Sequence, residues 1–147
     1  MSHRAANLPQ LLSEARRWFE DALFAGMEAA GEQPVTTAQA SVFAMLDAEG
    51  TTVSELARRI GVTRQTAHQA VHGLIGMGLL EQEPDPGSAR RRLIRTTPEG
   101  RRVHERAQAT IRVIESVLVE RIGPAKADAL REALTSDWGV PPLVTAP

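Results

Sequence analysis

Residues 53–100 read VSELARRIGVTRQTAHQAVHGLIGMGLLEQEPDPGSARRRLIRTTPEG and combine two short helical patterns, a glycine turn and a basic hairpin. Thr52 and Glu55 have the spacing of a capping box, which predicts a helix that begins after Thr52 and runs through Ile60. Gly61 suits the left-handed backbone conformation that ends such a helix. Thr63 then caps a second helix over about residues 64–77, so two helices should meet at a tight turn.

The second of these helices has two faces of opposite chemistry. Apolar side chains recur at three- and four-residue steps and should face inward, namely Ala67, Ala70, Val71 and Leu74. The opposite side carries a stripe of polar side chains, namely Arg64, Gln65, His68, Gln69 and His72. This stripe is mostly uncharged, which is typical of a face that reads the base edges of DNA, although an ordinary solvated helix face has the same composition.

A β-hairpin should follow directly. Residues 79–83 are a predicted strand, residues 84–88 (PDPGS) are a strong turn signal, and residues 91–96 form the returning strand. Thr97 and Pro98 then combine a helix cap with a proline at the first helical position. A helix pair followed by a hairpin is typical of proteins that place one helix in the major groove of DNA with the hairpin beside it.

Longer helical patterns flank this centre. Apolar residues at helical spacing predict long helices over 8–27 and 98–122, and shorter ones over 36–46 and 125–137. Thr36 and Gln39 form a second capping box, at the start of the 36–46 helix. The tail, residues 139–147, should be extended or disordered. The chain is therefore expected to be mainly α, with a small β-hairpin wing.

The composition fits one domain with extensions. The chain has 147 residues, of which 42% are hydrophobic but only 3% aromatic, so aliphatic side chains and alanine must form the core. No run approaches the roughly 20 apolar residues of a membrane span, and residues 1–10 lack the apolar stretch of a secretory signal. Because the sequence has no cysteine, disulfides, zinc–thiolate sites and thiol redox sensing are excluded. We expect a cytoplasmic protein.

Charge is unevenly distributed along the chain. The net charge is −1, yet residues 51–112 contain eleven arginines and six acids, a balance of +5, which leaves −6 for the remainder. A basic centre between acidic ends favours the binding of a polyanion to one face. Arginine can hold phosphate or guanine through its planar donors, although a GC-rich genome would equally explain why Lys126 is the only lysine.

Catalytic, cofactor and metal sites are not indicated. The serines lie in no nucleophile motif, and the glycines at 76 and 78 end a helix instead of opening a phosphate-binding loop after a strand. His68 and His72 stand four residues apart, but two ligands do not complete the four-ligand set of structural zinc. We therefore expect no enzymatic activity, no cofactor and no metal.

Three stretches together resemble the MarR family of winged helix-turn-helix regulators, namely VSELARRIGVTRQT, HGLIGMGLLEQEPDP and LIRTTPEGRR. The resemblance covers residues 35–105 in sequence and nearly the whole chain in helix order. It implies an N-terminal dimerisation helix within 1–34, a winged helix-turn-helix DNA-binding domain over 35–97 and C-terminal dimerisation helices over 98–138. It also implies a homodimer that binds a pseudo-palindrome in double-stranded DNA and represses transcription.

The resemblance and the polar stripe together assign the DNA contacts. The recognition helix would start at Thr63 and the wing tip would lie at residues 86–92, where Ser88 replaces the acid that family wings commonly carry, so the wing would be less firmly held. Arg90 is retained as the minor-groove residue. Because neighbouring side chains on a strand point to opposite faces, residues 90–92 should not all contact one groove, and one of the other two arginines should contact phosphate. The predicted DNA-binding residues are Thr63, Arg64, Gln65, Thr66, His68, Gln69, His72, Arg90, Arg91 and Arg92.

The resemblance further implies a small-molecule effector, aromatic or anionic, that enters between the dimerisation helices and the winged domain. Such a ligand would act by binding one of two conformations more tightly than the other. Trp18 and Phe43 are the candidate pocket residues, with packing in the core as the alternative role. Two other functions remain open, namely a winged helix that binds only a protein partner and a ligand-binding protein that has lost its DNA function.

Overall fold

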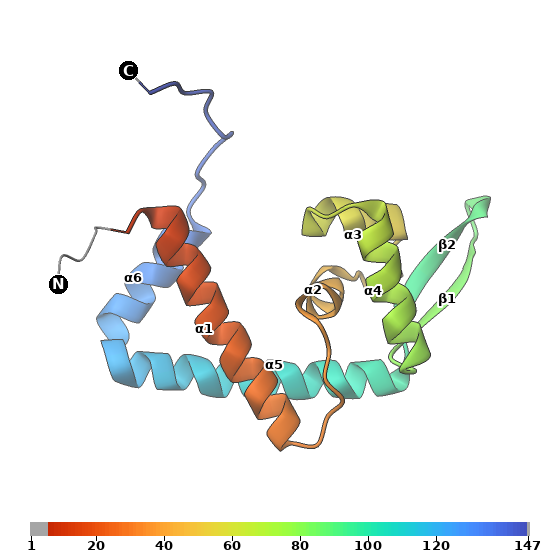
Figure 1. The fold of residues 1–147 in the computed structure, drawn as a ribbon, viewed down its shortest axis with the longest axis horizontal. Helices are drawn as coiled ribbons and strands as arrows, with labels where there is room; N and C mark the ends of the chain where they lie inside the picture. The colour runs from red at the N-terminus through yellow and green to blue at the C-terminus, as the bar shows by residue number, and fades with distance from the viewer. Residues whose placement is uncertain (1–5, 147) are drawn as a thin grey trace. The chain divides into compact units, whose positions relative to one another are not determined.

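The structure is a computed structural model that describes residues 6–146, a part of the chain with six helices and one antiparallel hairpin (Figure 1). The elements in chain order are α1 (Leu8–Ala29), α2 (Thr37–Met45), α3 (Val53–Ile60), α4 (Arg64–Gly76), β1 (Leu80–Asp85), β2 (Ser88–Thr96), α5 (Pro98–Ile122) and α6 (Pro124–Thr135). The chain forms two compact units that divide between Ile111 and Arg112, so α5 contributes to both. The predicted fold class, mainly α with a small hairpin, is confirmed.

Polar side chains fix the starts of the helices. At α2 the predicted capping box is confirmed, because the Thr36 hydroxyl accepts the Gln39 amide at 3.1 Å and the Gln39 side chain accepts the Thr36 amide at 2.9 Å. At α3 only half of the predicted box is present. Thr52 accepts the Glu55 amide at 3.2 Å, but the Glu55 carboxylate accepts hydrogen bonds from Arg58 and Arg59 instead of returning to Thr52. A charged partner outcompetes the neutral main-chain amide for that carboxylate.

The hairpin is longer than the sequence predicted. The strands pair from Leu80 opposite Thr96 to Pro84 opposite Arg92, and then Asp85 lies opposite Ser88. Proline is tolerated in β1 because a two-stranded sheet does not need every amide of an edge strand. The register shifts between Pro84 and Asp85, so residues 89–91 have no partner across the hairpin.

A bridge that the sequence did not predict connects the hairpin to the start of α3. The Thr51 amide donates to the Ile94 carbonyl at 3.0 Å, and the Ile94 amide donates to the Thr51 carbonyl at 2.9 Å. Thr51 is buried, and its hydroxyl accepts the Asp47 amide at 2.9 Å. These bonds hold the hairpin against the segment that precedes α3.

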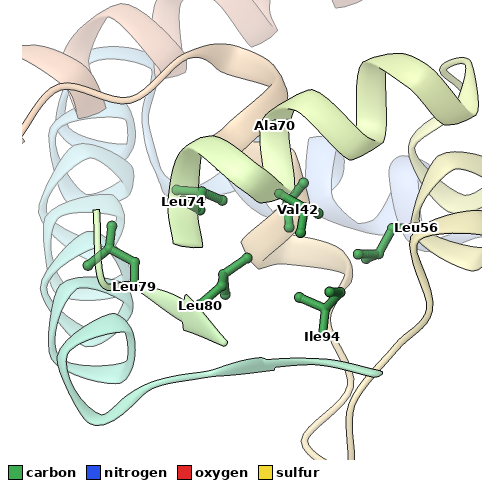
Figure 2. Close-up of a cluster of buried hydrophobic side chains, with 8 residues drawn as sticks. Val42, Leu56, Ala70, Leu74, Leu79, Leu80 and Ile94 are labelled. Carbon is green, nitrogen blue, oxygen red and sulfur yellow. The ribbon is translucent and has the colours of Figure 1, made fainter. Parts of the chain in front are cut away.

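The core of the first unit lies between α2, α3, α4 and the hairpin. Figure 2 shows its side chains pointing toward one another from these elements. The buried cluster consists of Val42, Leu56, Ala70, Val71, Leu74, Leu79, Leu80 and Ile94. As the composition predicted, it contains no aromatic residue. Because every one of these elements contributes to one cluster, α4 and the hairpin are held in a fixed relation to each other.

The junction between the hairpin and α5 is closely packed. The Thr97 hydroxyl accepts the Gly100 amide at 3.0 Å, which confirms the predicted cap, and donates to the Gly78 carbonyl at the end of α4 at 2.6 Å. The Thr97 amide donates to the Leu79 carbonyl at 3.1 Å. Gly100 is buried against this same Leu79 carbonyl. The turn after α4 and the first turn of α5 are therefore joined by main-chain contacts.

The second unit consists of the end of α5, α6 and the segment that follows. Arg131 of α6 donates to Glu115 of α5 at 3.0 Å, and the Trp138 indole donates to the Ala133 carbonyl at 2.9 Å. Large apolar side chains remain exposed in this unit, namely Val113, Val119, Leu130, Leu134, Trp138, Val140, Leu143 and Val144. None of the helices within residues 6–146 is long and apolar enough to cross a membrane.

Ion pairs around Arg59 connect α3 to the end of α2. The Arg59 guanidinium donates to the Met45 carbonyl at 2.9 Å, to the Asp47 carboxylate at 2.9 Å and to the Glu55 carboxylate at 3.0 Å. Hydrogen bonds from Arg58 and then Arg59 lower the pKa of Glu55 from 4.5 to about 2. The hydrogen bond from Arg59 likewise lowers the pKa of Asp47.

We expect this cluster to stabilise the fold least in acid. The Glu55 pKa is depressed in the folded state, so its stabilising contribution is present above pH 4.5 and is lost as the pH falls toward about 2. The difference in thermal midpoint between the wild type and Glu55→Gln should therefore be largest at neutral pH and should shrink below pH 4.5. Glu105→Gln, at an exposed carboxylate that no described ion pair includes, is the control. A difference that did not change with pH would contradict this account of the cluster.

Candidate nucleic-acid interface

Helix α4 presents one apolar face and one polar face, as the sequence predicted. Its buried residues are Ala67, Ala70, Val71 and Leu74. Its exposed stripe contains Arg64, Gln65, His68, Gln69 and His72. At the helix start, the Thr63 hydroxyl accepts the Thr66 amide at 3.1 Å and lies 2.9 Å from the Thr66 hydroxyl. Thr63 thus caps α4, and both threonines remain exposed at the positive end of the helix dipole.

A hollow of about 740 Å³ lies between α4, α3 and the hairpin. It brings together six of the ten residues predicted to bind DNA, namely Arg64, His68, His72, Arg90, Arg91 and Arg92. The other four, Thr63, Gln65, Thr66 and Gln69, are exposed on α4 outside the hollow. Figure 1 shows the hairpin extending beside α4 from the end of that helix.

The hollow also contains residues that were not predicted to bind DNA. They are Thr52, Val53, Ser54, Glu55 and Arg58 from α3 and its N-cap, and Gln82 from β1. The sequence contained a signal for two of them, because the inward pattern of Val53, Leu56 and Ile60 leaves Ser54 and Arg58 on the opposite side. Only the fold could place that side of α3 next to the hairpin.

The hollow is strongly cationic. Five arginines line it, namely Arg58, Arg64, Arg90, Arg91 and Arg92, against the single carboxylate of Glu55. That carboxylate already accepts hydrogen bonds from Arg58 and Arg59. No ion pair among residues 6–146 includes Arg64 or residues 90–92. Their positive charge is therefore free to attract a polyanion.

The tip of the hairpin is held by two short-range hydrogen bonds. The Asp85 carboxylate accepts the Gly87 amide at 2.8 Å, and the Ser88 hydroxyl accepts the Arg90 amide at 3.3 Å. Ser88, which stands where the family commonly has an acid, therefore still has a main-chain partner at the tip. All three arginines of residues 90–92 line the hollow. Residues 89–91 lie outside the paired register, so strict alternation is interrupted there. That the three do not all contact one groove of DNA stays a prediction.

His68 and His72 pack against each other on α4. Their ring centroids are 4.1 Å apart with an interplanar angle of 40°. Among the described residues there is no group of three or more histidine and acidic side chains able to hold a metal ion. Both histidines line the hollow, and their ring nitrogens can donate or accept hydrogen bonds there.

A second cavity, of about 390 Å³, lies in the first unit between α1, α2 and α5. Phe43, one of the two predicted pocket residues, lines it and stacks on His104 with ring centroids 6.1 Å apart. Trp18, the other, does not line it and instead meets Phe19 edge to face at 5.0 Å.

This arrangement defines a winged helix-turn-helix protein, in which α3 and α4 form the helix-turn-helix and the β1–β2 hairpin forms the wing. Residues 33–91 match the family model described as MarR family. The resemblance drawn from the sequence is thereby confirmed, and this segment is a MarR-family domain.

Comparison with known proteins extends the match beyond that segment. The chain is 29% identical over 109 residues to the uncharacterized protein Rv2011c of Mycobacterium tuberculosis, a match that covers 74% of this chain and 76% of the relative. It aligns with the transcriptional repressor CouR bound to a 23-mer DNA duplex at 26% identity and a TM-score of 0.76, over 91% of this chain and 94% of CouR. It aligns with the PcaV transcriptional regulator of Streptomyces coelicolor in complex with its natural ligand at 27% identity and a TM-score of 0.63, over 88% of this chain and 93% of PcaV. Over most of its length the chain is thus similar to MarR-family transcriptional regulators.

Proposed function

We propose that the chain is a sequence-specific DNA-binding regulator that acts as a homodimer on a pseudo-palindromic operator and represses transcription. One observation carries the proposal: Arg64, His68 and His72 of the α4 stripe border the same cationic hollow as three wing arginines, which no ion pair among the described residues includes. The structure of CouR with a DNA duplex supports this use of the fold. Contact with DNA also agrees with a cytoplasmic location.

Most of the predicted DNA-binding residues have a role that fits their position. Gln65 and Gln69 offer paired hydrogen bonds to adenine in the major groove, and Arg64 can reach guanine or phosphate. Thr63 and Thr66, at the N-terminus of α4, are placed to hold a backbone phosphate. Arg90 enters the minor groove, and either Arg91 or Arg92 binds a backbone phosphate.

Exposed apolar side chains support a dimer. Leu8, Leu11 and Leu12 at the start of α1 are exposed, as are Val113, Leu130 and Leu134 in the second unit. Apolar faces of this size on regular helices favour burial against a second copy. A two-fold dimer would present two α4 helices about 34 Å apart, one turn of DNA. Sedimentation that found a stable monomer at micromolar concentration would contradict the dimer.

The experiment that tests the function is a DNA-binding titration. The probe is the duplex that flanks the chain's own gene, compared with a shuffled duplex of the same composition, and both are titrated at several salt concentrations. We expect tighter binding to the flanking duplex and a steep loss of affinity with salt, because bound phosphates release counterions. Equal affinity for both duplexes, or affinity independent of salt, would reject the proposal.

Arg90→Ala should weaken binding to the flanking duplex by about 1–3 kcal/mol, the usual range for one specific contact. The effect should be smaller on the shuffled duplex, since the minor-groove contact depends on groove shape. Fluorescence anisotropy at one fixed salt concentration measures both affinities. Unchanged affinity would remove Arg90 from the interface.

We further propose that a small molecule regulates DNA binding from the cavity between α1, α2 and α5. The cavity volume, about 390 Å³, lies within the range of small-molecule sites. PcaV, which shares this fold, was solved with its natural ligand. A ligand that binds one spacing of the two α4 helices more tightly than another would shift the population away from the DNA-binding state.

A further inference from the structure

The ligand cavity has an apolar interior and a rim of acids. Its apolar lining includes Leu23, Phe24 and Met27 from α1 and Phe43 from α2. Three carboxylates, those of Glu20, Glu28 and Glu32, also line it, together with neutral polar side chains. Among the residues that the structure describes, no arginine or lysine lines the cavity, and His104 is the only lining side chain able to carry a positive charge.

The three carboxylates differ in how far they are neutralised. Glu32 is held by Arg102 at 2.7 Å and Arg106 at 3.1 Å, and the hydrogen bond from Arg102 lowers its pKa. Glu20 faces Arg16 at 3.7 Å, and the Arg16 side chain is 70% exposed, so this pair is weak. Glu28 belongs to no ion pair among the described residues. The cavity therefore keeps an uncompensated negative charge on its α1 side.

The spacing on α1 places this charge next to aromatic surface. Glu20, Phe24 and Glu28 follow one another at four-residue steps, so they lie on one face of the helix over about 12 Å. Phe24 and Phe43 both line the cavity and offer ring faces, which attract cations. The thioether of Met27 adds a polarisable contact for an aromatic ligand.

We infer that this cavity takes a small organic cation, a protonated amine or a quaternary ammonium on an apolar or aromatic body. The inference rests on the proposed regulatory role of the cavity and changes the expected ligand class, because the family resemblance implied an aromatic or anionic effector. An aromatic body fits the lining, but a carboxylate on that body would meet Glu20 and Glu28 with no arginine or lysine in the lining to receive it. Burying an unpaired anion beside other anions is unfavourable.

The test uses three probes of matched size and different charge, namely the phenylbutylammonium ion, phenylbutanol and phenylbutyrate. Each is titrated into the full-length protein by isothermal calorimetry at neutral pH. We expect phenylbutylammonium to bind about tenfold more tightly than phenylbutyrate, with phenylbutanol between them, since the carboxylates attract one probe and repel the other. Phe43→Leu should weaken all three, which locates binding in this cavity.

Charge-neutral variants separate the carboxylates from the rest of the cavity. Glu20→Gln combined with Glu28→Gln should lower the affinity for phenylbutylammonium about fivefold, raise that for phenylbutyrate and leave phenylbutanol unchanged. Glu105→Gln, which removes an exposed acid of α5 outside the cavity, should change none of the three affinities.

Three results would overturn the inference: tighter binding of phenylbutyrate, an unchanged cation-to-anion ratio in the double variant, or no binding of any probe. The salt-dependent DNA titration, run on the same preparation without probes, reports on the proposed function separately. If the protein still binds DNA specifically but the cavity prefers phenylbutyrate, the cationic ligand class is rejected and the proposed function stands. If the titration without probes shows no specific DNA binding, the proposed regulatory function itself is rejected.

Discussion

Gly100→Ala should lower the free energy of unfolding by about 3 kcal/mol, at the upper end of the usual range for overpacking. A Cβ at this buried position would overlap the main-chain carbonyl oxygen of Leu79 and lie 2.8 Å from the Thr96 side chain. That carbonyl also accepts the Thr97 amide, so it cannot move without disturbing the start of α5. Urea unfolding followed by circular dichroism measures the change, which should appear as a lower midpoint with an unchanged slope.

Gly76→Ala is the matched control for this substitution. Gly76 ends α4, and a Cβ there would have no heavy atom within 4 Å. Alanine is favoured over glycine in helices by about 0.5–1 kcal/mol, so Gly76→Ala should leave stability unchanged or slightly higher. If Gly100→Ala unfolded at the same urea concentration as Gly76→Ala, the close approach of α5 to Leu79 would be disproved.

Arg90→Glu combined with Arg92→Glu should weaken DNA binding on the order of a thousandfold, because two cations proposed to contact the DNA become two anions that its phosphates repel. Both residues line the cationic hollow and neither is neutralised by an ion pair among the described residues. The slope of log affinity against log salt should also become shallower by about 2, one unit for each lost contact. Fluorescence anisotropy across a salt series gives both quantities.

A control of equal charge change separates the hollow from the overall charge. Arg112→Glu with Lys126→Glu alters two exposed residues of the second unit that belong to no described ion pair. We expect this variant to lose little affinity and to keep the wild-type salt slope, since neither residue lines the hollow. Sedimentation checks that both variants keep the oligomeric state of the wild type. Similar losses in the two variants would show that net charge, and not the wing, governs binding.

Local sequence signals predicted most of the fold. Caps at Thr36, Thr63 and Thr97 and the break at Gly61 depend on neighbours within a few residues, and the structure confirms all four. Contacts between distant segments were not predictable from such signals. The bridge from Thr51 to Ile94 spans more than forty residues, and the hydrogen bond from Arg59 to Asp47 joins α3 to the segment that follows α2.

The candidate site was predicted in its chemistry but not in its shape. The polar stripe of α4 and the arginines of the wing followed from helical periodicity and charge. The contribution of Arg58 and Gln82 required the packing of α3 and β1 around the hollow. The irregular pairing that leaves residues 89–91 without partners was not predictable either, because strict alternation of side chains assumes an unbroken ladder.

The irregular pairing at the wing tip has a consequence for how such regulators diversify. The residues that anchor the hairpin in the core, Leu80 and Ile94, lie below the register shift, whereas residues 89–91 lie beyond it. Amino acids can therefore be inserted, deleted or exchanged at the tip without moving the anchored strands. We expect the length and sequence of this loop to be exchangeable between proteins of this fold. Such an exchange would change which DNA sequence is bound and leave the packing of the core unchanged.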